Sequence, residues 1–254
     1  MNLPLTERQA QILDYVIRDH LEAAEPVASG QLARLHRLGC SSATVRKELA
    51  ILEDAGFLTQ PHTSAGRIPT ALGYQYFVEN LMSVAGLGDG EQTSIRQQFH
   101  QAGDDVDRLM RLSASIMAQT SGLAGLVASG REHRPPRLYH AGLTQILLVP
   151  EFTADLAQLR GVVEILEHGT GLDPIISLLP RQGVEVIIGG APPLAGGLQV
   201  TLILSRFGGD VGCEADAGGV LGVVGPNRLA YERAVPTVGF VADLLTELLA
   251  RRAA

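Results

Sequence analysis

The chain has 254 residues, of which 46% are hydrophobic, so it is long enough for one large or two ordinary domains with a sizeable core. Its formal net charge of −7 argues against a protein that coats nucleic acid non-specifically, although it leaves room for a local basic face. No apolar run of about 18 residues and no secretory leader is recognisable, and Cys40 and Cys213 form no spacing pattern, which predicts a reduced cytoplasmic chain without a membrane partner.

The first 40 residues predict two helices separated by a short turn. Thr6 is a good N-cap for a helix over residues 7–22, in a near capping box, and Pro26 breaks the chain after it. The apolar stripe of this helix has helical spacing and consists of Ile12, Leu13, Val16, Ile17 and Leu21. Ser29 is expected to cap a second, short helix over residues 30–38. Three leucines are expected to bury that helix, namely Leu32, Leu35 and Leu38.

A third helix and a hairpin are predicted next. Ser41 or Ser42 is expected to be the N-cap, and Gly56 is expected to end the helix as a left-handed C′ residue. One buried stripe runs along it, made of Val45, Leu49, Leu52 and Ala55. The hairpin follows as a strand over residues 57–60, a loop over 61–66 and a return strand over 67–69.

Polar and basic side chains gather on the exposed parts of this segment. The first turn of the third helix carries Ser42, Thr44, Arg46 and Lys47, the last of which is the only lysine in the chain. The hairpin carries His62, Thr63, Ser64 and Arg67. A helix of this kind can enter a major groove while the hairpin lies along phosphates or a minor groove, which favours a winged helix-turn-helix that binds DNA. The alternative is a small structural domain of the same shape.

A linking region is predicted between residues 70 and 121. Thr70 is expected to cap a helix over residues 71–84, and the glycine-rich stretch 85–91 reads as a linker. Two helices should follow, over residues 92–101 and from Asp104 or Asp105 to about residue 120. Their apolar seam consists of Ile95, Phe99, Val106, Leu109, Leu112 and Ile116. This seam fits packing on the chain's own second domain and a helix shared across a dimer axis equally well.

The last 130 residues predict a mixed α+β domain. Residues 126–142 read as a short connector that contains prolines. Strands are expected over residues 144–149, 184–188, 198–207 and 218–224. Helices are expected over residues 156–167 and 172–179, together with a final helix that is kinked or restarted at Pro236. The first of these helices should be buried through Leu156, Leu159, Val163 and Leu166, and the last through Phe240, Leu244, Leu245 and Leu248.

Catalytic patterns are absent from the sequence. No phosphate-binding loop, no nucleophile elbow and no zinc spacing among the histidines and cysteines can be found. Glu164 and Glu167 are most simply a solvated helix face. We therefore expect a protein that is not an enzyme and needs no cofactor or metal.

The chain closely resembles the HrcA family of heat-inducible transcription repressors through residues 41–78, SSATVRKELAILEDAGFLTQPHTSAGRIPTALGYQYFV. Shorter matches are LTERQAQIL at 5–13, EPVAS at 25–29, PEF at 150–152 and GVVGPNRLAYERAVP at 222–236. The resemblance implies a homodimeric repressor of chaperone operons that binds the CIRCE inverted repeat, is released on heat and is kept active by the GroE chaperonin.

The resemblance also implies three parts of the chain. These are a winged-helix DNA-binding domain over residues 1–84, long linking helices over 85–125 and a GAF-like α/β domain over 126–254. Family members carry further strands and an inserted dimerising domain before the PEF segment, where this chain has only the short connector. We therefore expect a truncated GAF-like domain without the inserted domain, and a second subunit that covers an exposed strand edge.

The candidate DNA contacts divide into two groups. The four residues of the helix turn should meet base edges and nearby phosphates, with Arg46 as the best candidate for bidentate recognition of guanine. The four hairpin residues should hold the DNA backbone or minor groove. Other roles remain open, since Thr44 could face the core, Arg46 could pair with Glu48 or Glu53, and Arg67 could stabilise the hairpin. A rival function is a ligand-responsive winged-helix regulator whose GAF-like domain senses a small molecule.

Overall fold

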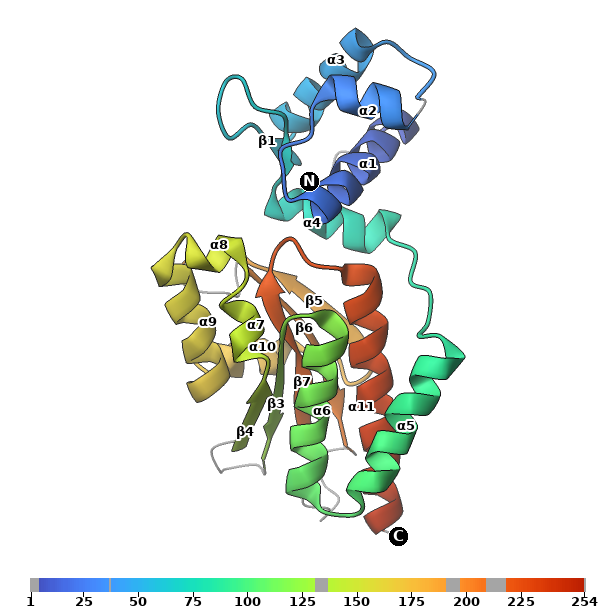
Figure 1. The fold of residues 1–254 in the computed structure, drawn as a ribbon, viewed down its shortest axis with the longest axis vertical. Helices are drawn as coiled ribbons and strands as arrows, with labels where there is room; N and C mark the ends of the chain where they lie inside the picture. Colours follow the sequence, from blue (N-terminus) through green and yellow to red (C-terminus); the bar gives the residue numbers. More distant parts are fainter. Residues whose placement is uncertain (1–4, 37, 131–136, 191–196, 209–217, 254) are drawn as a thin grey trace. The chain divides into compact units, whose positions relative to one another are not determined.

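The structure is a computed structural model that describes residues 5–36, 38–130, 137–190, 197–208 and 218–253 (Figure 1). The chain divides into two compact units. The first unit comprises residues 1–83 and 227–229, and the second comprises residues 84–226 and 230–254. Within the described ranges, no helix is both long and apolar enough to cross a membrane.

The first unit contains helices and a small two-stranded hairpin. Its elements are α1 (Glu7–Ala23), α2 (Ser29–Leu35), α3 (Ser42–Asp54), β1 (Leu58–Thr59), β2 (Ile68–Pro69), α4 (Ala71–Tyr76) and a π-helical turn, η1 (Phe77–Leu81). The predicted capping box is confirmed, because the Thr6 hydroxyl accepts from the backbone N–H of Gln9 and the Gln9 side chain accepts from that of Thr6. The fully buried side chains include Ile12, Leu13, Val16, Ile17, Leu32, Val45, Leu52 and Phe77.

For the second helix, both the predicted N-cap and the predicted last residue are wrong. The N-cap is Ala28, Ser29 makes no capping hydrogen bond, and Leu35 is 62% exposed. The helix stops there because His36 leaves it to contact α1. The His36 Nε2 atom lies 2.9 Å from Asp19 Oδ1, and its ring stacks on Tyr15 with the centroids 3.9 Å apart.

The helix predicted over residues 71–84 is shorter than expected. It passes into the π-turn at Phe77 and ends at Leu81. Tyr74 and Phe77 are its buried large side chains, whereas Val84, the last residue of the predicted helix, is 52% exposed. The predicted cap is confirmed, since the Thr70 hydroxyl accepts from the N–H of Gly73.

A five-stranded antiparallel sheet is the centre of the second unit. Its strands are β3 (Ala124–Ser129), β4 (Arg137–Ala141), β5 (Val184–Ile188), β6 (Val200–Phe207) and β7 (Gly219–Pro226), in the order β4-β3-β7-β6-β5. The register pairs Leu126 with Gly222 and Leu204 with Gly222 on either side of β7. The sheet is therefore continuous across its three central strands.

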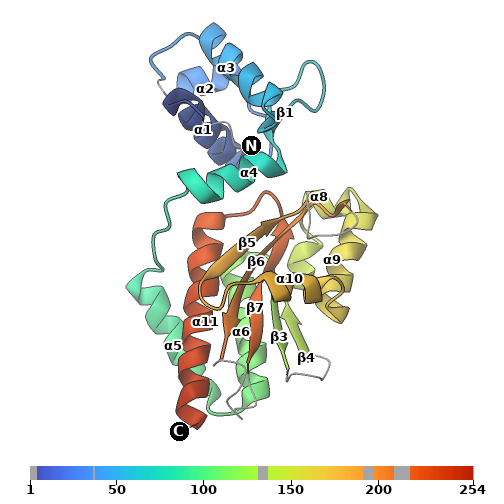
Figure 2. The same cartoon turned by 180° about the vertical axis from the view of Figure 1, so that it is seen from behind.

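Helices cover both faces of this sheet (Figures 1 and 2). One face carries α6 (Val106–Ser121) and α11 (Tyr231–Ala253), with α5 (Asp89–Ala102) beside them. The other face carries α7 (Leu143–Ile146), α8 (Pro150–Thr153), α9 (Leu156–His168) and α10 (Leu172–Leu178). Asp105 caps α6 as one of the two predicted alternatives, by accepting from the N–H of Arg108. The predicted seam, with Ile95, Phe99, Leu109 and Ile116 all buried, lies within this unit and so supports the packing alternative.

Three predictions for this unit are wrong, and a fourth is wrong in part. Residues 126–142 are not a mere connector, because β3 and β4 pair there from Gly125–Ala141 to Ser129–Arg137. The strand predicted over 144–149 is helix α7 with a turn, in which Ile146 is buried and Leu148 is 81% exposed. The buried residues of α9 are Val162, Ile165 and Leu166, whereas the predicted ones are Leu156, Leu159, Val163 and Leu166. Of the two outcomes expected at Pro236, a restart is wrong, because α11 is one helix from Tyr231 to Ala253, and a kink stays a prediction.

Helix α6 packs unusually close to strand β3. A Cβ atom built on Gly125 would lie 2.1 Å from the carbonyl oxygen of Ala114 and 3.1 Å from the backbone nitrogen of Ala118. The alanines on α6 and the glycine on β3 are therefore what allow the two backbones to meet. Any side chain at residue 125 must separate the helix from the sheet.

A hydrogen bond joins the exposed side of α6 to strand β4. The Tyr139 hydroxyl donates to Asp107 Oδ1 at 2.5 Å, and the Arg137 guanidinium lies 3.4 Å from the same atom. The tyrosine hydrogen bond, aided by the charges of Arg137 and Arg111, holds the pKa of Asp107 below its usual value. A lowered pKa in the folded state means that this contact stabilises the fold at neutral pH and is lost as the pH falls through that pKa.

Tyr139→Phe should therefore reduce the dependence of stability on pH in the acid range. The variant is expected to be less stable than the wild type at neutral pH and to approach it in acid, once the pH has fallen below the lowered pKa of Asp107 and this carboxyl is protonated in both proteins. Urea unfolding followed by circular dichroism at several pH values measures the difference. A constant gap between the two proteins at all pH values would contradict this assignment.

Candidate nucleic-acid interface

Helix α3 separates an apolar face from a polar, basic one. Val45, Leu49 and Leu52 are buried against the unit, which confirms three residues of the predicted stripe, whereas Ala55 is the C-cap and is only partly buried. Ser42, Arg46 and Lys47 are exposed at the opposite side of its first turns. Because residues four apart are neighbours on a helix, Ser42 and Arg46 lie next to each other.

The start of α3 is fixed by its own cap. Ser41 is the N-cap, and its Oγ atom accepts from the backbone N–H of Thr44 at 3.2 Å. The two hydroxyls, of Ser41 and Thr44, also lie 3.0 Å apart, and Thr44 is half-buried. Gly56, with φ of 83°, ends the helix as predicted. These contacts therefore hold the first turn of α3, on which Ser42, Arg46 and Lys47 are exposed, in a fixed conformation.

Neither cation of this turn is engaged elsewhere. Of the residues that the structure describes, none forms a hydrogen bond or ion pair with the side chain of Arg46 or Lys47. Glu48, one of the partners considered for Arg46, instead accepts from the Gln9 side chain at 3.2 Å, which ties α3 to α1. Both cations are therefore available for a negatively charged ligand without first breaking a contact.

The loop between β1 and β2 projects away from the helices of its unit (Figure 1). His62, Thr63 and Ser64 are exposed at its tip, and the Ser64 hydroxyl lies 3.3 Å from His62 Nδ1. The Gln60 side chain stabilises this tip by donating hydrogen bonds to the carbonyls of Thr63 at 3.1 Å and of Ala65 at 2.8 Å. The loop is therefore held in one shape by hydrogen bonds of its own.

Arg67 lies at the base of the hairpin and differs from the other cations. Its Nε and Nη2 atoms donate to Glu53 Oε2 at 3.1 and 2.7 Å, and its side chain is 19% exposed. Its backbone pairs with Val27 through two hydrogen bonds of 2.9 Å. The sequence does not predict the contact between Arg67 and Glu53, because it joins residues 14 positions apart, on the hairpin and on α3.

Two further arginines between residues 28 and 70 do not extend the interface. Arg34 is exposed on α2, with its Nε atom donating to the carbonyl of Gly30 at 3.1 Å. Arg37 lies outside the described residues. The eight predicted contact residues are thus placed on two elements, four on the first turns of α3 and four on the hairpin.

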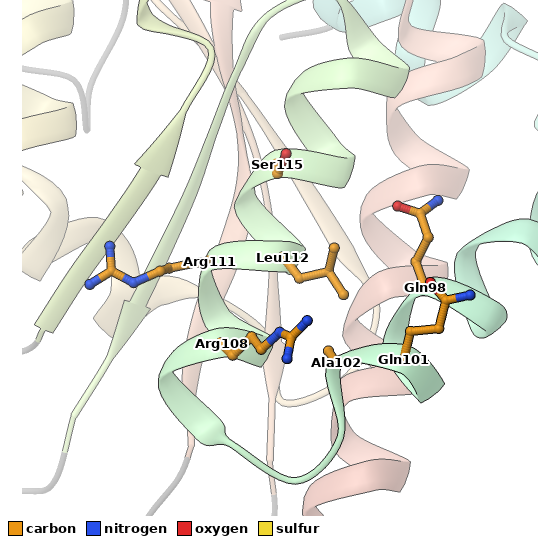
Figure 3. A pocket seen from close by; sticks show the side chains of 7 residues that line it. All are labelled: Gln98, Gln101, Ala102, Arg108, Arg111, Leu112 and Ser115. Carbon is orange, nitrogen blue, oxygen red and sulfur yellow. The ribbon is translucent and has the colours of Figure 1, made fainter.

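A second surface feature lies in the other unit, between α5 and α6 (Figure 3). This groove has a volume of about 410 Å³ and is lined by Gln98, Gln101, Ala102, Arg108, Arg111, Leu112 and Ser115. Figure 3 shows the guanidinium groups of Arg108 and Arg111 pointing in opposite directions, and Arg111 lies over the ring of Tyr139. The two cations do not converge on one ligand, so the groove does not favour the small-molecule sensor. Among the described residues, no group of histidines, cysteines and carboxylates could hold a metal ion.

Comparisons with known proteins show which family and which fold the chain is similar to. The model of the HrcA protein C terminal domain matches residues 91–235. A heat-inducible transcription repressor HrcA from Chloroflexus aurantiacus is 31% identical, over 98% of this chain and 95% of the relative. Its counterpart from Herpetosiphon aurantiacus is 31% identical over 98% and 96%. The crystal structure of a hypothetical protein at 2.2 Å resolution shares the fold, with a TM-score of 0.81, 17% identity and coverage of 99% and 100%.

These features define a class of protein, the transcriptional repressors, which are regulators and not enzymes at the level of the family. An exposed basic helix turn occurs in one unit, and a helix-covered antiparallel sheet forms the other. The chain belongs to the HrcA family of heat-inducible transcription repressors. It is therefore a repressor of heat-shock transcription, as the resemblance in its sequence implies.

Proposed function

We propose that the first unit is a winged-helix DNA-binding domain, within residues 1–84, that recognises one half of the CIRCE inverted repeat. The observation that carries this proposal is the first turns of α3, where Arg46 and Lys47 are exposed and unpaired among the described residues. In a winged helix, such a turn enters the major groove while the hairpin lies along the backbone.

The eight predicted residues form the proposed interface. On α3 these are Ser42, Thr44, Arg46 and Lys47, which face base edges and nearby phosphates. On the hairpin they are His62, Thr63, Ser64 and Arg67, which follow the backbone or the minor groove. The exposure of all but the half-buried Thr44 and Arg67 supports this division.

The protein acts as a homodimer, because an inverted repeat presents two half-sites related by a two-fold axis. In this proposal residues 85–125 provide long helices and residues 126–254 a truncated GAF-like domain without the family's inserted dimerising domain. The alignment with the Chloroflexus relative supports the missing insert, because it spans 358 positions whereas this chain has 254 residues, which leaves about 100 positions without a counterpart.

In this proposal the second subunit pairs with an edge strand of the sheet. Among the strands that the structure describes, β5 is at one end of the sheet and pairs with β6, and its one charged residue is Glu185. Antiparallel pairing of two such edges joins the two sheets about a two-fold axis. A chain that is strictly monomeric in sedimentation at micromolar concentration would exclude the dimer.

Heat releases this cytoplasmic repressor because a marginally stable second unit loses the dimer, and with it the two-fold DNA contact. The GroE chaperonin restores the active form by refolding it. Both steps rest on the family to which the chain belongs.

The first test is fluorescence anisotropy with a labelled CIRCE duplex and with the same duplex after one half-site is scrambled. Both titrations use one fixed salt concentration, because phosphate contacts make affinity strongly dependent on salt. We expect much tighter binding to the intact repeat, by about two orders of magnitude, since only that duplex engages both subunits. Equal binding to the two duplexes would contradict two-fold recognition.

A further inference from the structure

An acidic residue lies at the end of the helix that we propose to bind DNA. Glu53 occupies the last turn of α3, and its carboxylate accepts two hydrogen bonds from the Arg67 guanidinium, of 2.7 and 3.1 Å, on the same Oε2 atom. The side chains are 30% and 19% exposed, respectively, so the pair is partly shielded from water. Charge-assisted hydrogen bonds of this length are among the stronger polar contacts in proteins.

The backbone of Arg67 is held by hydrogen bonds, which keeps its side chain directed at Glu53. The N–H and C=O groups of Arg67 both bond to Val27, which fixes the opposite side of the return strand. The preceding residue, Gly66, passes so close to this segment that an added Cβ would lie 2.4 Å from the Val27 carbonyl. The hairpin base is therefore held between the segment before α2 on one side and the end of α3 on the other.

The rest of the hairpin is rigid enough to transmit this anchorage. Gln60 bonds to two carbonyls of the loop, and the backbone N–H of Ala65 donates to the carbonyl of His62 at 2.8 Å. Glu53 and Ser42 lie on the same helix, α3, about 16 Å apart at 1.5 Å per residue. Because the helix is one rigid element, a contact that holds Glu53 in place also holds Ser42 in place. A contact at the hairpin base thus sets the direction of the tip relative to the basic turn of α3.

We propose that Glu53 and Arg67 are positioning residues that lock the hairpin to α3, and that an acidic residue is therefore required for tight DNA binding. This inference rests on the proposed function of the unit. It predicts an effect opposite in sign to simple electrostatics, because removing a negative charge from a DNA-binding surface should strengthen binding. It also changes one assignment in the proposed interface, because Arg67 then acts through the hairpin and not through a phosphate contact of its own.

The test compares Glu53→Gln with Asp54→Asn in the full-length protein. Asp54 is the neighbouring acid on α3, is exposed and has no partner among the described residues. We expect Glu53→Gln to weaken binding to the intact CIRCE duplex by about tenfold, the equivalent of one charge-assisted hydrogen bond. Asp54→Asn should leave binding unchanged or strengthen it. Tighter binding by both variants would overturn the inference.

A charge exchange separates positioning from direct contact. The double variant Glu53→Arg with Arg67→Glu can restore the pair but places an acid where a phosphate contact would need a cation. We expect it to regain most of the affinity that Arg67→Ala loses, whereas continued loss, at a melting temperature equal to that of the wild type, would overturn the inference. The His62 ring signals in proton NMR report the hairpin directly and should shift in Glu53→Gln but not in Asp54→Asn.

The salt dependence gives an independent measurement. A direct phosphate contact by Arg67 would reduce the slope of log affinity against log salt by about one in Arg67→Ala, whereas a positioning residue leaves the slope unchanged. If the wild type binds the intact repeat and Glu53→Gln binds it equally well, the positioning role fails alone. If the wild type binds neither duplex, the proposed function fails and this inference fails with it.

Discussion

Replacing Arg46 by alanine is expected to weaken binding to the intact CIRCE repeat by about 1–3 kcal/mol per site, or roughly 5- to 150-fold, with a smaller effect on random duplex. The reason is the planar guanidinium, which can donate two parallel hydrogen bonds to the O6 and N7 atoms of guanine in the major groove. The side chain is exposed and unpaired among the described residues, so it gives up no contact within the protein when it binds. Anisotropy titrations with both duplexes at one salt concentration measure the ratio of affinities.

Two further variants make this result specific. Arg46→Lys keeps the charge but removes the planar fork, so it should retain affinity for random DNA and lose discrimination between sequences. Arg160→Ala removes an exposed arginine of the second unit that pairs with Glu164, and it controls for net charge alone. An Arg46→Ala variant that loses affinity equally for the intact repeat and for random DNA would show that Arg46 meets a phosphate rather than a base.

Replacing Gly125 by alanine is expected to lower the free energy of unfolding of the second unit by about 3 kcal/mol or more. A new Cβ atom would lie 2.1 Å from the carbonyl oxygen of Ala114 in α6, and backbone on both sides leaves no flexible side chain to yield. For a unit of this size the melting temperature should fall by roughly 6–12 °C. Thermal unfolding followed by circular dichroism or calorimetry measures it.

Gly90→Ala provides the matched control. This glycine lies in the first turn of α5 with no atom within 4 Å of an added Cβ, so alanine there should be neutral or slightly stabilising. DNA release should also occur at a lower temperature in Gly125→Ala, if loss of the second unit ends repression. Equal melting temperatures for Gly125→Ala and the wild type would show that α6 can move away from the sheet at little cost.

The sequence predicts the first unit well where each signal is local. The capping box of α1, the serine N-cap of α3 and the left-handed Gly56 depend on residues a few positions apart. The structure confirms the first and the last, and it selects Ser41 from the two predicted N-cap serines. The second helix fails because His36 packs on Tyr15 and Asp19 of α1, a contact that its own segment does not encode. The pairing of Glu53 with Arg67 is missed for the same reason, since it joins residues 14 positions apart.

The sheet of the second unit is harder to predict from sequence. Strand β3 contains alanine and glycine where a strand usually shows branched side chains, because α6 lies almost directly on its backbone. The segment 144–149 is apolar enough for a strand, yet only Ile146 is fully buried, which suits a single helical turn. Short apolar runs fit both kinds of element, and the packing partner decides between them.

The position of Lys47 has a practical consequence for labelling chemistry. It is the only lysine in the chain, and it lies exposed on the turn of α3 that we propose to meet DNA. Amine-directed reagents therefore reach one side chain besides the amino terminus. Reductive methylation with ¹³C-formaldehyde would place an NMR probe on that turn in the unaltered protein, so occupancy of the helix by DNA could be followed without a mutation or a fluorescent tag.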